Sequence, residues 1–152
     1  MPLFSGQHPS TIDDKSRIII PAKMRQAAGR DGEAGYYATR GIDDCIVIQT
    51  AARFEQKGAS TADEKIRQTA AGRMIERATF SRAEFTKCDK QGRFLLPAAL
   101  IESLGIGKNI VIVGVNDRIE VWDAARWEQV IKEAEEQLAK QAEQFYGGPN
   151  EA

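Results

Sequence analysis

The chain of 152 residues contains one sequence pattern twice. The run DDKSRIIIPA at residues 13–22 returns 76 residues later as DKQGRFLLPA at residues 89–98. Two further landmarks keep the same order: Ala28-Gly29 matches Leu104-Gly105, and DCIVI at 44–48 matches DRIEV at 117–121. Internal duplication constrains a fold more strongly than any local signal, because stacked or paired copies share one core. We therefore expect one pseudo-symmetric unit that presents the chemistry of its turn at least twice.

The composition favours a small protein of the cytosol. A chain of this length can bury one ordinary core or two interlocked halves, but not several large domains. It has no run of 18 apolar residues and no secretory leader, so we expect no membrane segment. The two cysteines, Cys45 and Cys88, are far apart and form no CxxC motif, which argues against a disulfide framework or a zinc site. We expect neither a metal nor a cofactor.

The net charge of −1 hides an uneven distribution. Residues 1–53 sum to +1, residues 54–93 to +3, and residues 94–152 to −5. An acidic pI of about 5.9 does not favour general affinity for nucleic acid, because counterion release requires clustered positive charge. Any DNA binding must then come from a local basic face that several subunits reinforce.

Each repeat is expected to form a strand, a tight turn, a strand, a short helix, a strand pair and a final helix. The turns fall at 14–16 and 90–92. The strands that follow, 17–20 and 93–96, are continuous apolar runs after one charge, which predicts burial on both faces. Pro21 and Pro97 then open helices that end at Gly29 and Gly105.

Further along each repeat, hairpins are expected around residues 41–44 and 114–117, and a long amphipathic helix over residues 124–146. These elements predict an α+β, β-rich fold of four parts. The parts are a first repeat at 7–54, a helical linker at 55–82, a second repeat at 83–126, and a C-terminal helix and tail at 127–152.

The Asp-x-x-Gly-Arg turn alone has an ordinary structural interpretation: Asp accepts backbone hydrogen bonds, Gly supplies a positive φ, and Arg pairs with a carboxylate. Two copies, each followed by an apolar triplet and Pro-Ala, resemble the MraZ family, in which one chain carries two AbrB/SpoVT-type DNA-binding motifs. The resemblance covers nearly the whole chain, from Phe4-Ser5-Gly6 to Ile119-Glu120-Val121-Trp122.

The resemblance implies a pseudo-twofold, swapped-hairpin β-barrel built from both repeats, with peripheral helices and a long C-terminal helix. It also implies rings of several subunits that bind short direct repeats in promoter DNA. The expected function is sequence-specific transcriptional regulation of the bacterial division and cell-wall gene cluster, in the cytoplasm and on the nucleoid. No membrane and no small-molecule substrate are expected as partners.

In the family the turn meets DNA, so Lys15 and Arg17 carry over as DNA-binding residues, with Arg25 on the adjoining helix. A guanidinium can bind guanine or phosphate with two parallel hydrogen bonds, and Lys supplies a compact charge for the backbone. Gln91 stands where the first copy has Lys15, so Arg93 is expected to be mainly structural or at a subunit interface. Ser16 replaces the family's glycine, which predicts a remodelled first turn. Further candidates are Asp13, Asp14, Ser16, Lys23 and Arg93.

The sequence also bears on two other functional classes. An enzyme is not expected, because His8 is the single histidine and the acidic doublets fall in turns or on a solvated helix. The rival interpretation is an oligomeric protein-interaction module, or an antitoxin-like scaffold, that binds through the acidic C-terminal helix without specific DNA readout. A basic set at Arg67, Arg73, Arg77 and Arg82 is interpreted either as a phosphate-binding stripe or as structural ion pairs, and its spacing does not keep one helix face.

Overall fold

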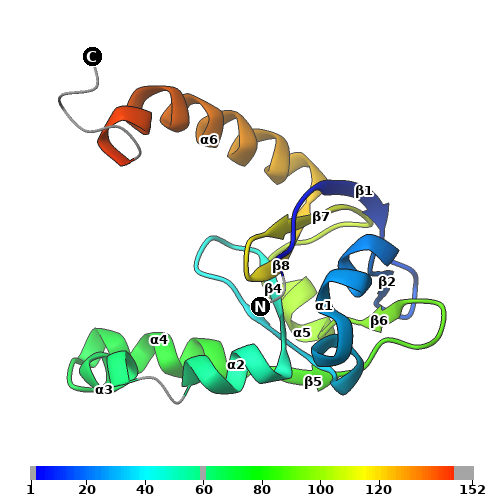
Figure 1. Ribbon diagram of the computed structural model, residues 1–152, viewed down its shortest axis with the longest axis horizontal. Coiled ribbons are helices and arrows are strands. Elements are labelled where there is room, and N and C mark those ends of the chain that lie inside the picture. The colour runs from blue at the N-terminus through cyan, green and yellow to red at the C-terminus, as the bar shows by residue number, and fades with distance from the viewer. Residues whose placement is uncertain (1–2, 59–60, 146–152) are drawn as a thin grey trace.

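The computed structural model describes residues 3–58 and 61–145. Figure 1 shows a β-rich body from which two helical segments project. The first repeat supplies β1 (Gln7–Thr11), β2 (Arg17–Ile19), α1 (Ala22–Ala34), β3 (Tyr36–Arg40), β4 (Ile46–Thr50) and α2 (Ala51–Gly58). The linker forms α3 (Thr61–Arg67) and α4 (Ala70–Phe80). The second repeat supplies β5 (Glu84–Thr86), β6 (Arg93–Leu95), α5 (Ala98–Ser103), β7 (Asn109–Val115), β8 (Arg118–Asp123) and α6 (Ala124–Phe145).

The two repeats exchange strands. The six-stranded antiparallel sheet has the order β1-β7-β8-β4-β3-β5, so the first strand of each repeat pairs with the third strand of the other. In this exchange Gln7 lies opposite Val113, and Phe85 lies opposite Tyr37. Swapping the two repeats reverses the strand order and leaves the sheet unchanged. The sheet therefore has pseudo-twofold symmetry, with β4 and β8 paired at its centre.

The expected α+β class is confirmed, with a large antiparallel sheet and a long C-terminal helix. The expected closed barrel is not present among the described strands, which form the open six-stranded sheet and a separate two-stranded sheet of β2 and β6. In that smaller sheet Ile18 lies opposite Phe94, the equivalent residue of the other repeat. The two repeats thus pair in both sheets.

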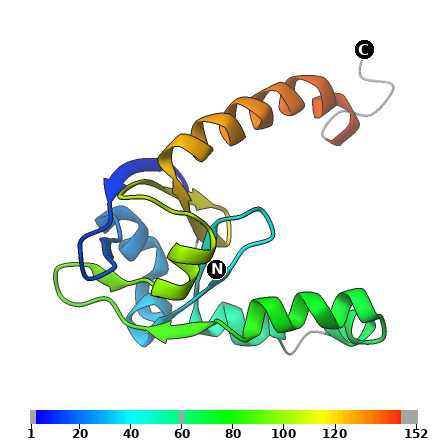
Figure 2. The ribbon, with the colours of Figure 1, turned by 180° about the vertical axis from the view of Figure 1, so that it is seen from behind.

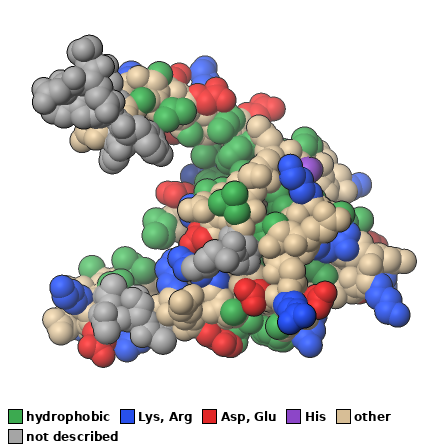
Figure 3. Space-filling view, in the orientation of Figure 1, with side chains coloured by type: hydrophobic (Ala, Val, Ile, Leu, Met, Phe, Trp, Pro, Cys, Tyr) green, Lys and Arg blue, Asp and Glu red, His purple; other side chains and the backbone are tan. Residues whose placement is uncertain are grey.

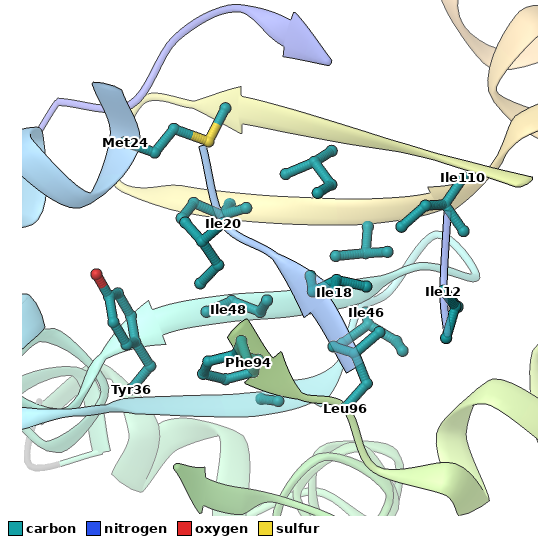
Figure 4. Packing of buried hydrophobic residues seen from close by; sticks show 14 of the residues in the cluster. Ile12, Ile18, Ile20, Met24, Tyr36, Ile46, Ile48, Phe94, Leu96 and Ile110 are labelled. Carbon is teal, nitrogen blue, oxygen red and sulfur yellow. The ribbon is translucent and has the colours of Figure 1, made fainter. Parts of the chain in front are cut away.

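The main core lies between the two sheets. Figure 4 shows Ile18 and Phe94 from the small sheet among Ile46, Ile48 and other side chains of the large one. Ile18 and Phe94 are 1% and 0% exposed, and the Phe94 ring meets Tyr36 edge-on at a centroid distance of 5.8 Å. Alternation along β2 and β6 directs Ile20 and Leu96 into the same core. One apolar layer therefore joins both repeats.

The other face of the small sheet is open, which corrects the expectation of strands buried on both faces. Ile19 and Leu95 are 56% and 48% exposed. A two-stranded sheet with one face on the core leaves alternate residues on the outside unless another layer covers them, and no described element covers these two. The apolar runs at 17–20 and 93–96 therefore supply one buried face each.

The helices also depart in part from expectation. Gly29 breaks the helical backbone with φ of +55°, as expected, but α1 resumes beyond it as far as Ala34. The helical linker expected at 55–82 contains two separate helices, α3 and α4, after the end of α2, and Thr69 caps α4 by accepting the Gly72 N–H at 2.9 Å. A Cβ at Gly72 would lie 1.8 Å from the Ile66 carbonyl oxygen, so this tight α3–α4 turn requires glycine.

Helices α2, α3 and α4 form an arm along one side of the body, and α6 leaves from the end of β8 (Figures 1 and 2). Stacked aromatic rings attach the arm to the sheet: Phe80 meets Phe54, which stacks on Tyr37 at 4.4 Å. The tail expected after α6 falls at residues 146–152, outside the described residues. No helix of the described part of the chain has the length and apolar character needed to cross a membrane.

Phe94→Ala should lower the free energy of unfolding by about 3–5 kcal/mol, because it opens a cavity in the layer shared by both repeats. The neighbouring Leu95→Ala is the matched control and should cost less than about 1 kcal/mol, since half of that side chain is already in solvent. Urea titration followed by circular dichroism measures both values. Equal losses would contradict the one-sided burial of β6.

Candidate nucleic-acid interface

The two Asp–Arg turns have the same hydrogen bonds. Asp13 Oδ1 accepts the backbone N–H groups of Lys15 and Arg17, each at 2.9 Å, and Asp13 Oδ2 accepts Arg17 Nε at 2.9 Å. In the second turn Asp89 Oδ1 accepts the N–H groups of Gln91 and Arg93, and Asp89 Oδ2 accepts Arg93 Nε at 2.6 Å. The duplication is thus preserved down to single hydrogen bonds.

Both turns place a residue in the left-handed region. Ser16 has φ of +63° and Gly92 has φ of +84°. The Ser16 N–H donates to the Asp13 carbonyl at 3.1 Å, and the Gly92 N–H donates to the Asp89 carbonyl at 3.0 Å. The first turn is therefore not remodelled, which corrects the expectation at Ser16. The serine adopts the backbone conformation of the glycine that it replaces.

The aspartate fixes the direction of each guanidinium. Asp13 binds Nε of Arg17, and the two terminal nitrogens of Arg17 have no partner within residues 3–58 and 61–145. The Arg17 side chain is 33% exposed. A guanidinium held at Nε can offer its terminal nitrogens as a fork to a guanine edge or a phosphate. Asp13 is thus a positioning residue, while Lys15 is exposed at the tip of the turn.

Both aspartates are stabilised in the charged form. The backbone N–H and the guanidinium of Arg17, with the Lys15 N–H, lower the pKa of Asp13 below its ordinary value of 3.8. The Arg93 side chain and backbone, with the Gln91 N–H, lower the pKa of Asp89 in the same way. Each turn therefore keeps its carboxylate ionised at neutral pH, which maintains the ion pair with its arginine.

The two turns lie at opposite ends of one strand pair. Arg17 lies opposite Leu95, and Ile19 lies opposite Arg93, so alternation places these four residues on the outer face of the small sheet. Figure 1 shows β2 and β6 together at the side of the body away from the helical arm. We call this surface the β2–β6 outer face. One surface thus carries the arginines of both turns.

Each turn is held by the other repeat. The Leu96 N–H donates to the Ser16 carbonyl at 2.8 Å, and the Ile20 N–H donates to the Gly92 carbonyl at 2.9 Å. Neither turn is a free loop, because its last carbonyl is part of the hydrogen bonding between the two strands. The arginine geometry therefore depends on the association of the two repeats.

Arg25 lies beside the second turn, although it follows the first in sequence. Its Nε donates to the Ile20 carbonyl at 3.0 Å, and a Cβ on Gly92 would lie 2.7 Å from that Nε. The guanidinium thus covers Gly92 and fastens α1 to the second turn. The equivalent residue of the second repeat is Ile101, so the repeat provides no matching guanidinium over Ser16. A side chain at position 92 would therefore have to displace the Arg25 guanidinium, whereas Ser16 has no such neighbour from an equivalent arginine.

The remaining candidates lie around the same surface. Asp14 is exposed at the tip of the first turn, and Lys23 is exposed in the first helical turn of α1. Sequence reasoning missed Lys90, which is exposed at the tip of the second turn in the position of Asp14. The alignment of the two repeats contained this signal, because it places a cation in the second turn next to Gln91.

Other candidate chemistry lies elsewhere. Arg67 forms an ion pair with Glu76 at 3.0 Å, and Arg73 donates to the Arg67 carbonyl at 2.9 Å, which supports the structural interpretation of these arginines. Burial raises the pKa of the Cys45 thiol to about 12 and that of Cys88 to about 11. Among the described residues no group of three His, Cys, Asp or Glu side chains could hold a metal ion.

Comparisons with known proteins match the chain over almost its full length. The model of the family described as "MraZ protein, putative antitoxin-like" matches twice, at residues 3–78 and 79–147. Proteins named transcriptional regulator MraZ are similar over 92–96% of this chain. The protein of Symbiobacterium thermophilum is 40% identical, and the match covers 98% of its length. The protein of Moorella thermoacetica is 35% identical, with 96% of its length covered. The protein of Saccharopolyspora erythraea is 32% identical, with 99% of its length covered.

Ser16→Gly should raise the free energy of unfolding by up to about 1 kcal/mol, because it removes the strain of an L-residue at positive φ. Gly92→Ala is the matched change in the second turn. It should lower stability by about 1–2 kcal/mol, because alanine is strained at the positive φ of Gly92, whereas the flexible Arg25 side chain can move away from the new Cβ. Denaturant titration measures the free energy of unfolding of both variants. A Ser16→Gly variant that is less stable than the wild type would contradict the strain at Ser16.

The ion pair in the first turn should be visible in the titration of Asp13. A depressed folded-state pKa adds stability above the unfolded value, and that stability is lost as the pH falls through the folded-state pKa. Arg17→Ala should raise the pKa of Asp13 part of the way towards 3.8, because backbone hydrogen bonds remain. Carboxyl titration by carbon-detected NMR measures the pKa of Asp13 in the wild type and the variant. Asp89 is the internal control, and its pKa should be the same in both.

Proposed function

The chain belongs to the MraZ family, and on that premise we propose that it is a sequence-specific DNA-binding transcriptional regulator. The observation that carries the proposal is the β2–β6 outer face, where two turns with the same pattern of hydrogen bonds present the arginines of both repeats. The family membership supports transcriptional regulation, since the relatives carry that name. The proposed role involves no catalysis, and its place is the nucleoid in the cytoplasm.

The residues of each turn have different proposed roles in binding DNA. Arg17, held at Nε by Asp13, offers its terminal nitrogens to a guanine edge or to a phosphate. Lys15 at the exposed tip supplies a charge for the phosphate backbone. The second turn can add Arg93 and Lys90 from the same surface. Arg25 is proposed as a supporting residue of this surface, because its guanidinium lies over Gly92.

The small contact surface favours the action of several subunits at once. A chain of net charge −1 has little general attraction for DNA, and two or three phosphate contacts give a log–log salt slope of only about −2 to −3. A ring of subunits on short direct repeats would multiply this slope and add affinity through effective concentration. The proposed target is the promoter of the division and cell-wall gene cluster.

The proposed architecture of the DNA-binding unit is the swapped-hairpin topology of the AbrB/SpoVT type, built from the open six-stranded sheet and the two-stranded sheet. Support comes from the exchange of strands between the repeats and from the apolar core between the two sheets. The two sheets would enclose this core from opposite sides. The pseudo-twofold symmetry would relate the two turns, so that both face one DNA groove.

Arg17→Ala should weaken binding to the organism's own division-cluster promoter at least tenfold, because one arginine contact contributes about 1–3 kcal/mol. The melting temperature should stay within a few degrees, since the side chain is on the surface. Arg30→Ala is the matched control: this arginine of the same repeat is exposed on α1 and should leave DNA binding unchanged. Gel shifts at several salt concentrations measure both variants.

Scrambled DNA of the same length separates the proposal from its rival. Equal affinity for the promoter and the scrambled sequence would contradict specific readout and support an antitoxin-like interaction module instead. A salt slope that stays shallow on a promoter with several repeats would contradict the ring. Unchanged binding by Arg17→Ala would remove the first turn from the interface.

A further inference from the structure

The β2–β6 outer face carries two large apolar side chains that the body of the protein leaves half exposed. Ile19 and Leu95 are 56% and 48% exposed, although the preceding residue of each strand, Ile18 or Phe94, is buried. They are equivalent residues of the two repeats, since Ile18 lies opposite Phe94 at the centre of the strand pair. The surface between the two turns is therefore partly apolar.

Arginine and apolar side chains alternate on this face. Arg17 lies opposite Leu95, and Arg93 lies opposite Ile19. Side chains directly opposite each other in an antiparallel pair have Cβ atoms about 5 Å apart. Residues two apart on one strand are separated by about 6.6 Å. Each apolar side chain thus has an arginine of the other repeat beside it and an arginine of its own repeat further along the strand.

The arginines leave these apolar side chains uncovered. A free arginine can lay its methylene stem over a neighbouring apolar side chain while its charge stays in water. Here Asp13 holds Arg17 at Nε, and Asp89 holds Arg93 at Nε, so each guanidinium is kept at its own turn. The two apolar side chains therefore remain open to a partner that approaches this face.

The surroundings of the two side chains are basic. The matched segments 13–25 and 89–101, which form the turns, the two strands and the starts of the next helices, carry six Lys and Arg against three Asp, a net charge of +3. Lys15 and Lys90 are exposed at the tips of the turns. Figure 3 shows Lys and Arg side chains at the side of the body where Figure 1 places β2 and β6.

This mixture of groups fits the major groove of DNA better than it fits a protein. Apolar patches that mark protein interfaces are contiguous and larger than a few hundred Å². Here two apolar side chains alternate with two cations. The major groove admits a two-stranded ribbon, and its floor presents acceptors on guanine and a methyl group on thymine. The arginines match the acceptors, and the apolar side chains match the methyl groups.

We infer that Ile19 and Leu95 bind the C5-methyl groups of thymine bases in the major groove. The arginine further along the same strand would meet a guanine or a phosphate nearby, since about 6.6 Å corresponds to two base-pair steps of about 3.4 Å. Sequence readout then combines hydrogen bonds from the arginines with apolar contacts from the strands. This inference rests on the proposed DNA binding and adds residues that determine which sequence is bound.

Replacing thymine by deoxyuridine tests the contact, because it removes the C5-methyl group and keeps the hydrogen bonds of the base pair. The thymines of the organism's own division-cluster promoter are replaced one at a time, and binding of the full-length wild type is measured by gel shift. At least one replacement should weaken binding threefold or more, since one buried methyl group changes an affinity about fourfold.

Variants of the protein identify the side chains that meet these methyl groups. Ile19→Ala and Leu95→Ala should each remove the sensitivity to deoxyuridine at the thymines that their side chains contact. Their melting temperatures should stay within a few degrees of the wild type, because both side chains are half exposed. Ile42→Ala is the matched control: this isoleucine is 92% exposed at the tip of the β3–β4 hairpin and should keep the sensitivity of the wild type.

The outcomes separate this inference from the proposed function. A wild type that binds the promoter specifically and is unaffected by every replacement overturns the inference and leaves the proposed function intact. Sensitivity that persists in the double variant Ile19→Ala/Leu95→Ala also overturns it, since another residue then meets the methyl groups. If that sensitivity persists while light scattering shows a smaller assembly, the two side chains belong to a contact between subunits. Equal affinity of the wild type for promoter and scrambled DNA overturns both proposals.

Discussion

The exchange of strands between the repeats is the constraint on which the rest of the structure depends. Within each repeat only the last two strands pair with each other, and β1 and β5 find their partners only in the other half. Ile18 and Phe94 are buried because the small sheet joins both repeats and closes over their common core. The two turns also depend on the pairing of the repeats, because the Leu96 N–H donates to the Ser16 carbonyl and the Ile20 N–H donates to the Gly92 carbonyl. Arginine geometry at the surface is therefore a property of the whole fold.

The duplicated pattern predicted the turns and the order of elements, because these follow from short-range chemistry. Asp13 and Asp89 organise their turns through neighbours within four residues, which a sequence reveals directly. The exposure of Ile19 and Leu95 was not predictable in this way, since an apolar run does not reveal how many layers will cover it. The position of Arg25 over Gly92 required knowledge of pairing between distant segments.

The repeats share a backbone but differ in chemistry. The first turn has Asp14 and Lys15 at its tip, whereas the second has Lys90 and Gln91. Arg25 covers the second turn, and Ile101 stands in its place for the first. The two arginine forks are thus alike in shape and unlike in their electrostatic surroundings. If this surface binds DNA as proposed, its two turns would meet the bases with different charges at their tips.

The pairing of Gln7 with Val113 also determines when the protein can fold. Domains of many proteins fold as they leave the ribosome. Here β1 cannot pair until β7, at residues 109–115, has been synthesised. Until β5 is made, β3 has no partner for the edge that β5 later occupies, and unpaired edges can join other chains. Sheets built from such distant pairings fold slowly, in about milliseconds to seconds. The exposed edge of the unfinished first half is thus a consequence of the same exchange that gives the completed molecule its two matched turns.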